Sequence, residues 1–138
     1  MFMRELGEFL GWFTVVFFSL SFLNPVVKYV QKTFGKTLLK KEALKKPWQM
    51  FMKIIVKNHR LFGLMAALGA VGHFLVQYSR WGFVLSGVVP AVLMLLQGSL
   101  GYLVSKAKKE TKKTLLLVHK IIAVLMVLAI ATHLIQMG

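Results

Sequence analysis

Four histidines are the residues of this chain best suited to chemistry, and they form two pairs with one spacing. His59 and His73 lie fourteen residues apart in one apolar segment, and His119 and His133 lie fourteen apart in another. Along an α-helix, fourteen residues turn the side chain by roughly 1400°, about 40° short of four turns, and advance it by about 21 Å. Each pair is therefore expected on one helix face, with one imidazole in each half of a bilayer.

If the two helices run parallel, each histidine of one helix meets a histidine of the other at the same depth. Two imidazoles facing each other can bind one iron from both sides, and haem combines such an axial pair with a large apolar body. We therefore expect two stacked b-type haems, the inner held by His59 and His119 and the outer by His73 and His133. Filled axial positions favour electron transfer over oxygen binding.

Other roles for buried histidines stay open. A single histidine in a membrane helix is often a hydrogen-bonding partner of a neighbouring helix or part of a proton relay. A zinc or copper site would instead gather its histidines within a few ångströms, as i, i+4 pairs do. The matched spacing of four histidines in two separated layers favours haem.

Composition indicates the elements that must position these histidines. Of the 138 residues, 57% are hydrophobic and only 16% charged, which is typical of a membrane protein. An apolar run of about 18 residues or more can cross a bilayer. We expect one all-α transmembrane domain over residues 1–138, an integral multi-pass protein of a bacterial or archaeal plasma membrane. Its four spans are residues 9–29, 54–78, 83–104 and 115–136.

The lysines and arginines predict the orientation of this bundle. Sixteen of the 18 lie in residues 28–60 or 106–120, and only Arg4 and Arg80 lie elsewhere. Because cytoplasmic flanks retain basic residues, both termini are expected outside the cell. Residues 31–53 are expected to form a basic cytoplasmic linker, in which residues 36–52 resemble a helix lying on anionic lipid. Membrane lipid is the expected partner of these lysines, with docking of an acidic redox protein as the alternative. The chain offers no soluble basic domain for nucleic acid.

Small residues on the third span are expected to make room for the cofactors. Gly87 and Gly101 are again fourteen residues apart. Close helix packing is the alternative role for each glycine. Further small residues that would serve are Gly7, Gly11, Gly98, Ser19 and Ser21.

Cations beside the histidines are candidates to bind haem propionates. Arg60 and Lys120 follow directly after the two inner histidines. Their alternative role is to extend toward the lipid headgroups. Near the outer pair, the polar candidates are Arg80, Gln77 and Gln136.

The segment from His59 through Gly63 to His73 resembles the HR-x-x-G-x9-H signature of the ferric reductase-like transmembrane domain, which ferric reductases and NADPH oxidases share. The helix of His119 and His133 is similar to the second ligand helix of that family. The resemblance covers residues 58–138 and implies two haems between parallel helices, with the first histidine of each helix at the inner haem. This agrees with the orientation expected from the lysines.

The chain departs from that family by lacking its outer helices and its cytosolic flavin and nicotinamide domain, since no glycine-rich dinucleotide motif occurs. We therefore expect an oxidoreductase or electron-transfer subunit whose donor is a separate flavoprotein, a redox protein or a quinol, and whose acceptor is extracytoplasmic. Without cysteine, neither an iron–sulfur cluster nor a covalently attached haem can form.

Three other identities stay open. A quinol-oxidising cytochrome b subunit shares the fourteen-residue intervals, although the first ligand of each of its helices lies on the outer side. A haem-free transporter or assembly factor would use the histidines for protons. A designed sequence would explain the heavy repetition of leucine, valine and lysine, although irregular glycines and prolines are typical of natural chains.

Overall fold

The computed structural model describes residues 1–137, apart from the side chain of residue 38. It confirms the predicted all-α architecture of four helices. All four are long and apolar enough to cross a membrane, as a multi-pass membrane protein requires. The helices are α1 (Phe2–Lys40), α2 (Glu42–Trp81), α3 (Leu85–Lys106) and α4 (Lys109–Met137).

Helices α1 and α2 are much longer than the spans expected from the sequence. At about 1.5 Å per residue, their 39 and 40 residues extend for about 60 Å each, twice the thickness of a bilayer core. Residues 31–53, expected as a linker, are helical except at Lys41, where an extended backbone (φ −89°, ψ 104°) separates α1 from α2. We call residues 31–53 the basic hairpin.

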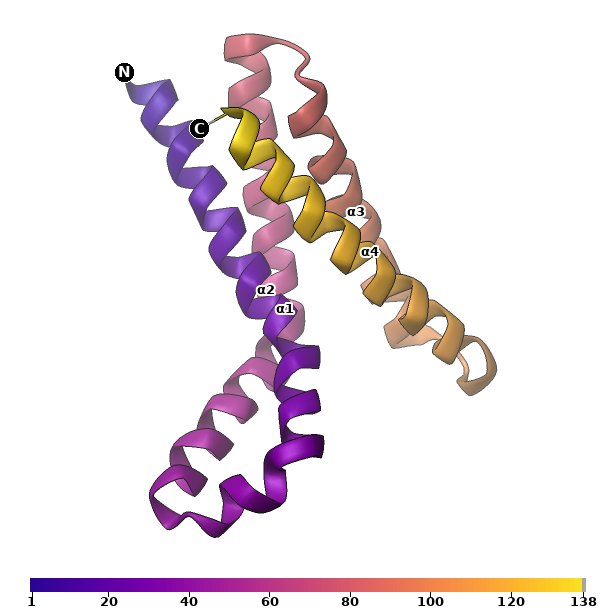
Figure 1. The fold of residues 1–138 in the computed structure, drawn as a ribbon. Helices are drawn as coiled ribbons and strands as arrows, with labels where there is room; N and C mark the ends of the chain where they lie inside the picture. The colour runs from indigo at the N-terminus through magenta and orange to yellow at the C-terminus, as the bar shows by residue number, and fades with distance from the viewer. Residues whose placement is uncertain (138) are drawn as a thin grey trace.

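The helices form two hairpins that cross each other (Figure 1). Helix α1 packs along α2, helix α3 packs along α4, and α2 also contacts α3. Both termini lie at one end of the molecule, and the α1–α2 and α3–α4 connections lie at the other (Figure 1). Helices α2 and α4 therefore run in the same direction, as the histidine pairing requires.

The turn between α2 and α3 depends on one glycine. Gly82 has φ +71°, a backbone conformation that side chains rarely adopt, and its N–H donates to the carbonyl of Tyr78 at 2.9 Å. This bond ends α2 and sends the chain back through the membrane in three residues. Pro25, Pro47 and Pro90 lie inside helices without ending them.

The centre of the molecule is a small apolar layer with one residue from each helix. It consists of Phe18, Ala66, Met94 and Met126, of which Ala66 and Met126 are fully buried. Most other large apolar side chains are exposed, including Leu68 (59%) and Leu128 (59%). Such a surface is stable against lipid rather than water.

Candidate functional site

The structure brings the four histidines together in the two pairs expected from their spacing. The ring centres of His59 and His119, the inner pair, are 6.3 Å apart, and their planes are 84° apart. The rings of His73 and His133, the outer pair, are 6.1 Å and 80° apart. In both pairs an imidazole of α2 faces one of α4 across the gap between the two hairpins.

This separation fits one metal atom between two imidazoles. A metal–nitrogen bond of about 2 Å on each side, added to the radius of the imidazole ring on each side, gives about 6 Å between ring centres. Edge-to-face contact between two rings has the same range of distance and angle, so the metal interpretation also depends on the matched spacing of the two histidine pairs. Among residues 1–137, no group of three or more histidines, cysteines or carboxylates could hold a metal ion, and each pair offers two imidazoles.

Helix α1 fixes the rings of both α2 histidines through its backbone. Nδ1 of His73 donates to the carbonyl of Gly7 at 2.8 Å, and Nδ1 of His59 donates to the carbonyl of Ser21 at 3.0 Å. A carbonyl can only accept, so each Nδ1 carries the proton and each Nε2 keeps its lone pair. Histidines that bind metals are commonly oriented in this way.

Helix α3 orients the α4 histidines less evenly. Nδ1 of His133 lies 3.3 Å from the hydroxyl of Ser86. His119 differs, because its Nε2 lies 3.3 Å from the Nε2 amide of Gln97, which donates to it. The buried Nδ1 of His119 and Oε1 of Gln97 have no hydrogen-bonding partner. At the inner pair, Gln97 therefore caps the nitrogen that would bind a metal.

Glycines on α1 and α3 lie directly against the histidine rings. A methyl group added at Gly87 would lie 3.4 Å from Cε1 of His133, and one at Gly101 would lie 3.4 Å from Cε1 of His119. At Gly11 the added methyl would lie only 3.0 Å from Cε1 of His73. Larger side chains at these positions would displace the imidazoles, so the glycines leave the space that the rings occupy.

One fourteen-residue interval recurs on all four helices. It separates the histidines of α2, the histidines of α4, Gly87 from Gly101 on α3, and Gly7 from Ser21 on α1. The central layer lies halfway, since Ala66, Met94 and Met126 are each seven residues from the site residues of their own helix. The molecule therefore has two equivalent histidine layers separated by one apolar layer.

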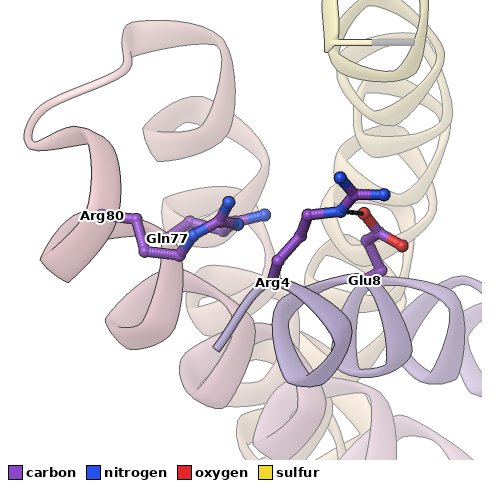
Figure 2. A network of polar contacts seen from close by, with 4 residues as sticks. All are labelled: Arg4, Glu8, Gln77 and Arg80. Atoms are coloured by element: carbon purple, nitrogen blue, oxygen red, sulfur yellow. Dashed lines mark hydrogen bonds and ion pairs between the residues drawn. The ribbon is translucent and has the colours of Figure 1, made fainter. Parts of the chain in front are cut away.

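The charged candidates lie at the rims. Arg60 and Lys120 are exposed beside the inner pair, and their role toward propionates stays a prediction. At the opposite end, Nη1 of Arg80 donates to Oε1 of Gln77 at 2.9 Å (Figure 2). Arg4 pairs there with Glu8 at 3.0 Å. With Glu5 included, the two arginines and two glutamates at this end balance each other.

Sequence reasoning missed Gln97 and the acceptors for the histidine Nδ1 atoms. Ser21 and Gly7 had been considered only as small residues, and Gly98, also considered, has nothing within 4 Å of an added methyl group. No protein-family model matches the chain, and neither a curated protein nor a solved structure shows detectable similarity to it.

Proposed function

We propose that this protein is a transmembrane di-haem b-type cytochrome that carries electrons across the membrane, in the manner of the ferric reductase-like domain that its sequence resembles. The observation that carries the proposal is the ring separation of 6.3 Å in the inner pair and 6.1 Å in the outer pair. The two α2 histidines donate through Nδ1 to carbonyls of α1, which leaves their Nε2 atoms available to a metal.

The residues present fit this cofactor. His59 with His119, and His73 with His133, would hold one haem each, and Gly11, Gly87 and Gly101 keep bulk away from the rings. At the inner pair, the Gln97 amide that caps Nε2 of His119 would have to move aside for haem, and the buried Nδ1 of His119 has no hydrogen-bonding partner. Haem, when bound, supplies a reversible one-electron couple.

The chain itself orients the rings and excludes water. The α1 carbonyls hold the α2 imidazoles in one tautomer, in which Nε2 keeps its lone pair. The central layer of Phe18, Ala66, Met94 and Met126 separates the two sites by apolar side chains, which oppose the passage of ions and protons but do not stop electrons.

The direction of transfer follows from the charge of the two ends. With the basic end in the cytoplasm, His59 and His119 would hold the haem on the donor side, and His73 and His133 would hold the haem on the side of an extracytoplasmic acceptor such as ferric iron. The proposed donor is a separate flavoprotein, another redox protein or a membrane quinol.

Transmembrane electron transfer can be measured in sealed vesicles that contain the purified protein and trapped ferricyanide. Dithionite added outside should reduce the trapped ferricyanide, and His73→Ala should abolish this by breaking the outer site. Leu75→Ala, which shortens an exposed side chain on the same helix, is the matched control and should transfer normally. Equal rates in vesicles with and without protein would refute the proposal.

A quinol-oxidising cytochrome is the second candidate, and a hollow beside the outer pair favours it. The hollow lies between α3 and α4, has a volume of about 300 Å³, and is mainly apolar with a few polar groups, as ligand sites commonly are. It is lined by Leu85, Ser86, Val89, Ala129, Thr132 and Gln136. Reduction of the protein by quinol alone, without any flavoprotein, would favour this candidate.

A further inference from the structure

The charge of this protein is confined to one end. Sixteen of the 18 lysines and arginines and two of the four glutamates lie in residues 28–60 and 106–120, so that end carries the whole net charge of +14. At the opposite end Arg4 and Arg80 are balanced by Glu5 and Glu8. A partner selected by charge would therefore be acidic and would bind at the end that holds the inner pair.

The basic hairpin extends far past the inner pair. Lys41, at its tip, is eighteen residues from His59, or about 27 Å along the helix. If the two histidine layers, about 21 Å apart, are centred in a bilayer core of about 30 Å, the tip reaches about 20 Å beyond the core. Figure 1 shows the basic hairpin diverging from the α3–α4 connection, which ends closer to the helix crossing. The tip of the basic hairpin therefore lies in the aqueous phase, beyond the lipid surface.

A row of cations follows α2 from this hairpin to the inner pair. Lys46, Lys53, Lys57 and Arg60 lie within about 60° on one helix face, and all four are exposed. The opposite face of α2 is turned toward α1, where Ile55 is 2% exposed. Nε1 of Trp48 donates to Oε1 of Gln31 across the hairpin at 2.7 Å. The hairpin is therefore closed on its inner face and basic on its outer face.

Apolar side chains accompany the lysines on the hairpin. Met50 is 64% exposed and Phe34 is 54% exposed. Methionine and aromatic residues are enriched at the centres of protein interfaces, where they fill pockets of a partner. An exposed apolar residue beside a row of cations is complementary to a partner surface that has acidic groups around an apolar centre.

We propose that the basic hairpin is the docking surface for an acidic electron-donor protein, which it guides toward the inner histidine pair. The proposal rests on the proposed function and names the class of donor. The exposed lysines increase the rate of encounter with an acidic partner through long-range attraction, and they orient it on the row that ends at Arg60. Binding is consequently expected to weaken as salt is added.

The test uses the full-length haem-loaded protein in nanodiscs of phosphatidylcholine, with a flavodoxin of net negative charge as the probe, measured by calorimetric titration. Lys46→Glu/Lys53→Glu should weaken binding about tenfold or more, because two charges on the row are reversed and the net charge falls by four units. Lys108→Glu/Lys112→Glu, at the α3–α4 connection, changes the net charge equally and should have a much smaller effect. Lys46→Arg/Lys53→Arg keeps the charge and should bind as the unchanged protein does.

The docking proposal would be wrong if both glutamate variants lost flavodoxin affinity equally, or if protein containing two haems bound no flavodoxin. Neither result would contradict the proposed function. Purified protein without haem absorption would refute the proposed function before any titration is made. A parallel arm replaces half the phosphatidylcholine by phosphatidylglycerol. If the anionic lipid abolishes flavodoxin binding and the Lys46→Glu/Lys53→Glu variant restores it, the hairpin binds lipid and the proposal is wrong.

Discussion

Replacing Gly11 by alanine should selectively damage the outer site. The added methyl group would lie 3.0 Å from Cε1 and 3.1 Å from Nδ1 of His73, closer than carbon atoms ordinarily approach. The imidazole cannot easily retreat, because its Nδ1 is held at 2.8 Å by the carbonyl of Gly7, one helical turn away from Gly11. The ring must therefore shift by a few tenths of an ångström, away from the position that faces His133.

Overpacking of this kind costs about 1–3 kcal/mol. If the whole cost falls on the site, haem affinity at the outer pair drops by a factor between about 5 and 150, since about 1.4 kcal/mol corresponds to tenfold. The same glycine-to-alanine change favours the helix by up to about 1 kcal/mol, which makes the loss of overall stability smaller than the loss of affinity. In Gly11→Ala, haem affinity at the outer pair should consequently fall by more than the free energy of unfolding does.

The assay is haem titration followed by redox difference spectra, with two other glycine variants for comparison. Gly98→Ala meets nothing within 4 Å and should bind two haems normally, while Gly101→Ala, at 3.4 Å from His119, makes an ordinary contact and should lose little. Retention of both haems with unchanged affinity in Gly11→Ala would refute the reasoning, as would a larger loss in Gly98→Ala than in Gly11→Ala.

Three further predictions concern the inner site and the ring geometry. Gln97→Leu removes the amide that caps Nε2 of His119, a bond worth about 0.5–1.5 kcal/mol, so inner-haem affinity should rise by about two- to tenfold in a haem titration; weaker binding would contradict this. Arg60→Gln removes a cation that stabilises the reduced inner haem and should lower its midpoint potential in a redox titration; an unchanged potential would exclude this role. Ring planes 84° and 80° apart should give strongly anisotropic low-spin signals in electron paramagnetic resonance, whereas the spectrum of parallel rings would show that the imidazoles have turned.

The pairing of histidines was predictable because it follows from helical periodicity. A fourteen-residue interval nearly completes four turns, so His59 and His73 had to share one face, and parallel helices had to bring them level with His119 and His133. Gly87 and Gly101 were expected to make room for the cofactors, which stays a prediction, and the structure places these glycines against His133 and His119.

The partners of the histidines could not be predicted in the same way. The carbonyls of Gly7 and Ser21 accept from Nδ1 through the backbone, which leaves no signal in the residue type, although the Ser21 hydroxyl also lies 3.0 Å from Nδ1 of His59. Gln97 meets His119 only because of the packing register between α3 and α4, which one sequence does not specify.

The basic hairpin was underestimated for a different physical reason. Its alternation of lysine and apolar residues correctly indicated a helix, but such a pattern also fits a helix lying on lipid. The break between α1 and α2 is confined to Lys41, a residue with good helix propensity, so nothing in the sequence shows that both helices continue to that point.

A pyridine haemochrome assay on the purified protein tests most directly whether the facing imidazoles hold haem. The unchanged chain should contain two b-type haems, and His73→Ala should contain one, because the inner pair of His59 and His119 remains intact. Colourless protein, or a haem content that is unaffected by replacing both His73 and His133, would contradict the assignment of the histidine pairs as haem ligands.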